Sequence, residues 1–197
     1  YYKNWKAQQY MTKKAFAPIF VAPKTTNGKV EFHVISDKLK TQKAVLKITA
    51  MDFNGNIISS TKNNINIQPN TSSIYHTAEI ADLLKEYQKQ DVVVLSEIVI
   101  KNKIVSDNIT YFAEPKDIIL LKPEIIKTFS ISKDGKTQLT LSSKTLVKDV
   151  FITLKGASLK LSDNYFDLLP NIDKTLSFET LGIDNSKVEI TSLFDTY

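Results

Sequence analysis

The stretch YFAEPKDIILLKP, residues 111–123, divides the sequence into two halves. Its two prolines, Pro115 and Pro123, cannot donate a main-chain hydrogen bond, and each restricts the conformation of the residue before it. Continuous β-sheet across this stretch is therefore unfavourable. Because strand-like segments lie on both sides of it, the stretch predicts a joint between two domains.

Length and composition narrow the class of protein. The 197 residues accommodate two immunoglobulin-like sandwiches of ~100 residues each, and a hydrophobic fraction of 42% is sufficient for two packed cores. The longest apolar runs, such as residues 92–95, are far shorter than the ~20 residues that cross a bilayer, so we expect no membrane partner. The absence of cysteine excludes disulfides, thiolate nucleophiles and cysteine zinc sites.

The net charge of +5 is concentrated at the start of the sequence. Residues 1–16 hold four lysines and no acid, residues 17–114 hold 11 lysines and 10 acids, and residues 115–197 hold 11 of each. All 26 basic residues are lysine, which lacks the planar fork that arginine presents to phosphate and guanine. Neither half shows the basic clustering that nucleic acid requires, so no nucleic-acid partner is expected.

Residues 1–16 predict a short helix. Ala7, Tyr10, Met11 and Ala15 recur at helical spacing, and a proline follows the run. A helix of this length needs an apolar partner. It either docks on the first sandwich or is the last helix of a preceding domain, in which case the sequence opens within a helical pattern and the true N-terminus is missing.

Residues 17–121 predict a first β-sandwich with one inserted helix. Apolar and polar residues alternate from Val30 to Ile35, and Asn54-Gly55 is a favoured hairpin turn. A single apolar helical face behind a capping threonine predicts a helix over residues 77–89. The predicted strands are 30–35, 44–53, 57–58, 65–67, 92–101 and 104–112, with a loop over 69–73.

Residues 122–197 predict a second, C-terminal sandwich. Asp134-Gly135 is a strong hairpin signal, and the short strand spacing without βαβ alternation is typical of a Greek-key sandwich. The predicted strands are 125–132, 137–142, 147–154, 159–161, 165–168, 176–180 and 188–192. The fold class is therefore all-β: two tandem immunoglobulin-like β-sandwiches with a short N-terminal helix and one helix inserted in the first sandwich.

The segment SDNYFDLLPN, residues 162–171, resembles a signature in the C-terminal immunoglobulin-like domain of β-mannosidases of glycoside hydrolase family 2. Asp163 and Asn164 suit a turn, and the aromatic pair that follows supplies one ring for the core and one for the neighbouring sheet. The family usually has glycine where Asn171 stands. Asparagine tolerates the left-handed geometry of that corner, so we expect the corner to form.

Two further segments are similar to the same family. WKA at 5–7, continuing to FAP at 16–18, is similar to the end of the catalytic barrel and the start of the first β domain. NITYF at 108–112, followed by PKD at 115–117, is similar to the last strand of that domain and its exit. In order and spacing, the three segments frame nearly the whole chain.

The resemblance implies a bacterial enzyme that removes terminal non-reducing β-D-mannose residues with retention of configuration. Retaining glycosidases need two carboxylates ~5 Å apart, and the family places them on a (β/α)₈ barrel of ~250 residues. The family's Asn-Glu acid/base pair is absent here. The resemblance thus implies that residues 1–16 are a stub of a missing barrel and that the sandwiches, inactive alone, support it.

Polar residues that could carry chemistry have simpler explanations. His33 and His76, without cysteine nearby, predict surface histidines rather than a metal site. Asp163 and Asp167 lack the ligand spacing of a calcium loop and predict a turn and a strand end. Acids at helical spacing predict a solvated face rather than general acid/base groups: Glu79, Asp82 and Glu86. We predict no catalytic, cofactor-binding or metal-ligating residue, and no cofactor.

Sugar binding by the sandwiches is the main alternative function. The chain has eight Tyr and ten Phe, but its single tryptophan, Trp5, lies outside both sandwiches. Several phenylalanines fit strand positions where core packing is the default: Phe32, Phe53, Phe129, Phe151 and Phe178. A carbohydrate-binding module for mannan and an adhesion module unrelated to any enzyme remain alternatives. The compartment stays open; analogy with exported polysaccharide-degrading bacterial enzymes points to the periplasm or the exterior.

Overall fold

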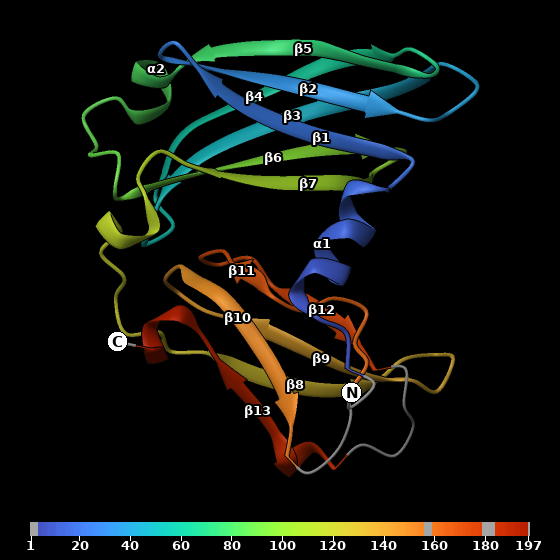
Figure 1. Cartoon of the computed structure of the whole chain (residues 1–197), viewed down its shortest axis with the longest axis vertical. Coiled ribbons are helices and arrows are strands. Elements are labelled where there is room, and N and C mark those ends of the chain that lie inside the picture. The colour runs from blue at the N-terminus through green and yellow to red at the C-terminus, as the bar shows by residue number, and fades with distance from the viewer. Residues whose placement is uncertain (1–3, 156–158, 179–183, 197) are drawn as a thin grey trace. The chain divides into compact units, whose positions relative to one another are not determined.

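The chain forms two compact units, each built mostly of β-strands (Figure 1). The computed structural model describes residues 4–155, 159–178 and 184–196. The first unit holds residues 13–52 and 56–119, and the second holds residues 1–12, 53–55 and 120–197. The predicted fold class, all-β with two immunoglobulin-like sandwiches, is confirmed.

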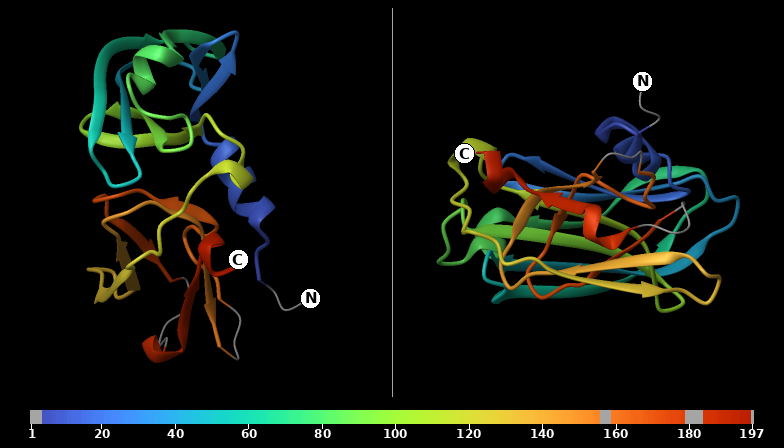
Figure 2. Two further views of the ribbon diagram at one scale, coloured as in Figure 1. Left: turned by 90° about the vertical axis from the view of Figure 1, so that its left-hand side faces the viewer. Right: turned by 90° about the horizontal axis from the view of Figure 1, so that it is seen from below.

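Seven strands of the first unit form two antiparallel sheets, which Figures 1 and 2 show as two layers. One sheet has the order β1-β2-β5, and the other has the order β4-β3-β6-β7. Their bounds are β1 Ile19–Thr26, β2 Lys29–Ser36, β3 Gln42–Asp52, β4 Ile57–Ile67, β5 Thr71–Glu79, β6 Val92–Ile100 and β7 Lys103–Tyr111.

The core of the first unit lies between these sheets. Along β2 the side chains of Val30, Phe32 and Val34 are fully buried, whereas Ile35 is exposed, as the predicted alternation requires. The second layer contributes fully buried Leu46 from β3, and together these residues belong to one apolar cluster. This alternation is why the sequence pattern located β2 correctly.

Strands β1 and β4 of the first unit differ from the prediction, and both lie at sheet edges. Strand β1 was not predicted, and it contains Pro23, which an edge strand tolerates because the missing N–H need not face a partner. Strand β4 was predicted as two short strands, but it pairs with β3 from Ile57 to Ile67, with one register shift between Ala50 and Met51 of β3. Its middle, residues 59–64, is polar and has no buried residue, so the sequence there shows no strand alternation.

The predicted helix over residues 77–89 is wrong in length and start. Strand β5 continues to Glu79, and α2 covers only Ile80–Leu84 before Lys85 adopts a left-handed φ of 50°. Strand β5 also begins at Thr71, inside the predicted loop. The apolar face was predicted correctly, since the side chains on it pack against the core: Ile80, Leu83, Leu84 and Tyr87.

The second unit contains two three-stranded antiparallel sheets, β12-β9-β8 and β11-β10-β13. Their strands are β8 Ile126–Ile131, β9 Thr137–Ser142, β10 Val147–Leu154, β11 Phe166–Leu168, β12 Lys174–Ser177 and β13 Val188–Thr191. Both sheets contribute to one buried cluster, in which Leu139, Leu141 and Phe178 are fully enclosed. The unit is therefore a second sandwich.

Most predicted strands of the second unit are present, with one correction. The predicted strand 159–161 is only an isolated bridge between Leu161 and Phe178. The predicted strand 176–180 corresponds to β12, and residues 179–180 lie outside the described residues. Short 3₁₀ turns complete the chain: Pro115–Asp117, Asn185–Lys187 and Leu193–Thr196.

The N-terminal helix α1 spans Ala7–Ala15, shorter than the predicted 1–16, of which residues 1–3 lie outside the described part. Its first residues, through Thr12, belong to the second unit, and the rest belongs to the first. None of the helices in the described part of the chain combines the length and apolar character needed to span a bilayer.

Candidate functional site

The two histidines lie on neighbouring strands without forming a site. Strands β2 and β5 pair Phe32 with His76, and the rings of these two residues are 6.1 Å apart. His33 instead lies beside Glu31, with Nε2 3.2 Å from Oε2. Among the residues that the structure describes, no group of three or more His, Asp or Glu side chains could hold a metal ion.

The three acids expected on one helical face do not share a helix. Glu79 is the last residue of β5, and its carboxylate lies 3.0 Å from Lys29 Nζ on β2. Asp82 lies in α2, but the helix ends before Glu86. The predicted common face is therefore wrong, because strand pairing with β2 extends through Glu79.

Asp163 and Asp167 are held by backbone N–H groups and lysines. Asp163 Oδ1 accepts a hydrogen bond from Asn164 N at 3.0 Å, and its other oxygen lies 2.9 Å from Lys174 Nζ. Asp167 Oδ1 accepts one from Asp149 N at 2.8 Å. Asp163 thus lies at the predicted turn, whereas Asp167 is the middle residue of β11, Phe166–Leu168, and not at a strand end.

The side chain of Asn164, in the signature segment at residues 162–171, makes the hydrogen bonds to β10 that a neighbouring strand would otherwise make. Its buried side chain accepts a hydrogen bond from Ile152 N at 3.0 Å and donates one to Ile152 O at 2.9 Å. The same oxygen accepts a hydrogen bond from Tyr165 N at 3.0 Å. One side chain thus satisfies both main-chain groups of a residue in β10, which would otherwise be costly to bury.

Tyr165, next to Asn164, has a left-handed backbone with φ of 58°. This conformation is unfavourable for a bulky residue, so the surrounding contacts must maintain it. Its ring stacks on Phe151 of β10, with centroids 4.6 Å apart, while Phe166 enters the core as predicted. Partial burial raises the pKa of the Tyr165 phenol, since the charged form is poorly solvated there.

The N-terminal segment packs beside the ring of Tyr165. Its ring lies 6.1 Å from that of Tyr10, which is buried and contacts Trp5 edge-on at 5.3 Å. Lys160 Nζ lies 5.0 Å from the centre of the Trp5 ring. Asn4 Oδ1 accepts a hydrogen bond from Leu159 N at 2.9 Å.

We call Trp5, Tyr10, Phe151 and Tyr165 the aromatic anchor. It corrects one interpretation of α1: the buried ring of this helix packs in the second unit and not on the first sandwich. Where the helix enters the first unit, its contact is ionic, since Lys14 Nζ lies 3.7 Å from Asp107 Oδ2.

A second asparagine holds strand β1 in the first unit. Asn108 Nδ2 donates a hydrogen bond to Val21 O at 3.0 Å, and Ser106 Oγ accepts one from Val21 N at 3.0 Å. Both side chains come from β7, so they connect the two sheets through backbone groups of β1. Asn108, the first residue of the NITYF segment that resembles the family, therefore has a structural role.

The sequence did not reveal the hydrogen bonds from these two asparagine side chains to distant main-chain groups, nor one ion pair. Asn108 and Asn164 stand in segments identified only by resemblance, and nothing local signals a partner 87 or 12 residues away. Glu97 of β6 is buried, with its carboxylate 2.9 Å from Lys47 Nζ on β3. Predicting this ion pair would have required the register between β3 and β6, which places Glu97 opposite Lys47.

The predicted core phenylalanines are partly confirmed. Phe32, Phe53 and Phe178 are buried. Phe129 and Phe151 are only half-buried, and each lies beside another ring, that of Phe178 and that of Tyr165 respectively. Phe151 is part of the aromatic anchor.

Comparison with known families agrees with this architecture. Residues 28–117 match the family model of the mannosidase Ig/CBM-like domain, and residues 120–196 match the Ig-fold domain model of mannosidases. No curated protein matched the chain.

Two solved structures share the fold. A β-D-mannosidase from Dictyoglomus thermophilum aligns with a TM-score of 0.84 and 19% identity over 98% of this chain and 23% of its own. An exo-chitosanase from Amycolatopsis orientalis aligns with a TM-score of 0.65 and 14% identity over 97% of this chain and 27% of its own. The chain thus spans about a quarter of either protein.

The resemblance inferred from three short segments is confirmed by these family matches, which cover most of the chain. The chain belongs to the mannosidase Ig/CBM-like and Ig-fold domain families, with one domain of each in tandem.

Proposed function

We propose that the chain is the non-catalytic accessory region of a glycoside hydrolase, and that its role is to hold the end of a preceding catalytic domain. The observation that carries this proposal is the aromatic anchor. Tyr10 is buried at 3% exposure, and its helix enters both units. Because its buried ring fixes the position of this segment, the segment would restrain the end of a catalytic domain attached in front of it.

The wider proposal names the parent enzyme as a retaining β-mannosidase acting on terminal non-reducing β-D-mannose residues. The family matches and the fold of the Dictyoglomus protein support it. In this proposal residues 1–16 end a catalytic barrel, residues 17–121 and 122–197 are the two sandwiches, and the partners are the preceding domains of the same polypeptide.

Two assays test the division of labour. The purified chain is expected to release no chromophore from a chromogenic β-mannoside, whereas the product of the whole gene should release it. Turnover by the chain alone would contradict the accessory role. Activity of the whole product on another β-glycoside only would leave the accessory role intact and refute the mannosidase assignment.

A second candidate function is mannan binding, and the CBM-like description of the matched family favours it. Affinity electrophoresis separates the two functions. A supporting domain migrates at the same rate in gels with and without mannan, whereas a binding module is retarded by the polysaccharide. Retardation that persists in the Tyr165→Ala variant would assign binding to a surface other than the aromatic anchor.

A further inference from the structure

Four segments that are distant in sequence lie at one end of the first unit: the residues before β1 and the β2–β3, β4–β5 and β6–β7 connections. Antiparallel register places the start of β1 beside the end of β2, since Ile19 pairs with Ser36. The β2–β3 loop is tied to its neighbours by hydrogen bonds from Asp37 N to Pro18 O, 3.0 Å, and from Asn70 N to Lys38 O, 3.2 Å. Figure 1 shows the arrowhead of β2 at this end of the unit.

The β6–β7 turn lies at the same end. Val45 of β3 pairs with Val99 of β6, so the beginning of β3 faces the turn at Lys101 and Asn102. This register brings two lysine-bearing segments, residues 37–41 and 101–103, to the same end of the strands of the four-stranded sheet. No stretch of sequence contains both.

We call the lysines gathered here the basic end; they are Lys38, Lys40, Lys43, Lys101 and Lys103. All five are exposed. Within the described part of the chain none of their ammonium groups lies in an ion pair, and the one acid in these loops is Asp37. Their charges therefore face solvent, where physiological salt screens them over a Debye length of ~8 Å.

Exposed apolar side chains stand among these lysines. Leu39, at the tip of the β2–β3 loop between two lysines, is 81% exposed, and Ile104 beside Lys103 is 59% exposed. Isolated exposed aliphatic residues are common, but each of these two lies next to a lysine of the basic end, and cationic and apolar side chains together suit a membrane interface. Polar glycans and free phosphate would use the lysines and leave these side chains in water.

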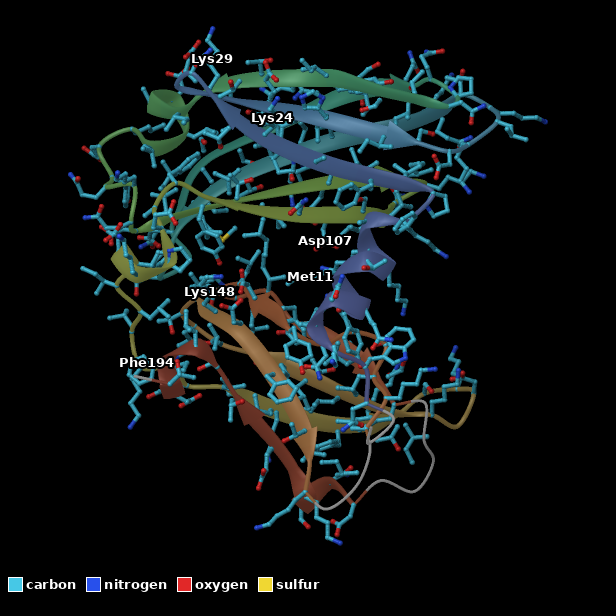
Figure 3. The ribbon with its side chains drawn as sticks, in the orientation of Figure 1. Met11, Lys24, Lys29, Asp107, Lys148 and Phe194 are labelled. Atoms are coloured by element: carbon cyan, nitrogen blue, oxygen red, sulfur yellow. The ribbon has the colours of Figure 1, made fainter. Side chains whose placement is uncertain are left out.

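The opposite end of the unit lacks this excess of positive charge. Lys29, labelled in Figure 3, lies there and is neutralised by Glu79. The connection around α2 adds three more acids against two lysines: Asp82, Glu86 and Asp91 against Lys85 and Lys89. The excess positive charge of the unit is thus concentrated at one end of its strands, which favours that end facing an anionic surface.

We propose that the basic end docks the protein peripherally on an anionic lipid surface, with the lysines at the headgroups and Leu39 and Ile104 reaching the acyl boundary. This goes beyond the accessory function and does not depend on it. The sequence analysis expected no membrane partner because no apolar run could span a bilayer. Peripheral binding needs only clustered charge and a few apolar tips, and the tertiary structure supplies both.

Vesicle cosedimentation tests the proposal on the whole 197-residue chain. Vesicles of phosphatidylcholine and phosphatidylglycerol in equal amounts are expected to pellet the protein at low salt, and pure phosphatidylcholine vesicles are not. Raising the salt should release it. The K38E/K40E/K103E variant should lose at least ~100-fold in vesicle affinity, and L39S about tenfold.

The matched control is K62E/K89E/K116E, which changes the same charge at exposed positions away from the basic end. It should bind within a few-fold of the unchanged protein, and unfolding curves of all variants verify folding. Equal losses in both triple variants would overturn the proposal, as would failure to pellet with anionic vesicles at low salt. So would a K38E/K40E/K103E-sensitive shift in polygalacturonate gels without vesicle binding, because it would assign the basic end to acidic glycans.

Discussion

Asn164 concentrates three hydrogen bonds on one buried side chain, so its removal should have a large effect. The Asn164→Ala variant leaves Ile152 N and Ile152 O without partners in the interior of the second unit. We expect a loss of about 3 kcal/mol in the free energy of unfolding, measured by urea denaturation. Asn185→Ala, at an exposed position of the same unit, is the control and should change stability by less than ~0.5 kcal/mol.

Tyr165 allows backbone strain to be separated from ring packing. Both Tyr165→Ala and Tyr165→Gly remove the stacking on Phe151, but only glycine adopts a φ of 58° without steric cost. The glycine variant should therefore be more stable than the alanine variant by about 1 kcal/mol. An alanine variant that equals or exceeds glycine in urea denaturation would show that the backbone there is not strained.

Asp134 gives a pH-dependent prediction at a single turn. The Ser132 hydroxyl, 2.5 Å from Asp134 Oδ1, is the main cause that holds the pKa of this carboxyl below its ordinary value of 3.8. A lowered pKa means that the carboxylate favours the folded state above the ordinary value, and that this contribution disappears as the pH falls through the folded pKa.

Ser132→Ala should raise the pKa of Asp134 toward 3.8, as followed by carboxyl carbon chemical shifts in an NMR titration. Asp184 is an internal reference, because its pKa is lowered in the same way by Ser186. An unchanged Asp134 pKa in the variant, or a simultaneous shift of Asp184, would argue against the hydroxyl as the cause.

At the scale of elements, α1 offers a matched pair of adjacent residues. Tyr10 is buried against Tyr165, whereas Met11, labelled in Figure 3, is 58% exposed. We expect Tyr10→Ala to lower the free energy of unfolding of the second unit by about 3 kcal/mol and Met11→Ala to change it by less than ~0.5 kcal/mol. Similar losses from both variants would mean that the helix, and not the anchor ring, matters.

The elements also show how far local pattern reasoning reaches. Strand β2 was predicted correctly because its buried and exposed residues alternate around Phe32. Strand β5 was not, because its sequence TSSIYHTAE has no alternation and its extended form comes from pairing with β2. Helix α2 was predicted too long, since helical spacing of Ile80 and Leu84 cannot reveal where β5 ends.

At the scale of the whole molecule, the N-terminal segment should hold a cut chain together. Insertion of a specific protease site between Ile119 and Leu120, in a stretch without strands, separates residues 1–119 from 120–197 after cleavage. The two pieces should still elute as one species in gel filtration, because the described residues 4–12 belong to the second unit.

The control for this experiment is the same cut in a Tyr10→Ala background, where the pieces should separate. Separation in both backgrounds would show that the aromatic anchor is too weak to join the two fragments. Coelution in both would show that contacts other than Tyr10 are sufficient.

The sequence by itself determined the two sandwiches, their order, most of their strands and, through the segment at residues 162–171, their family. These features follow from local alternation, turn residues and prolines, which act between near neighbours. Only the tertiary structure decided that Asn164 completes β10, that Tyr10 packs on Tyr165, and that two loops form one basic end. Such contacts depend on register and on burial of distant residues, which no short window of sequence contains.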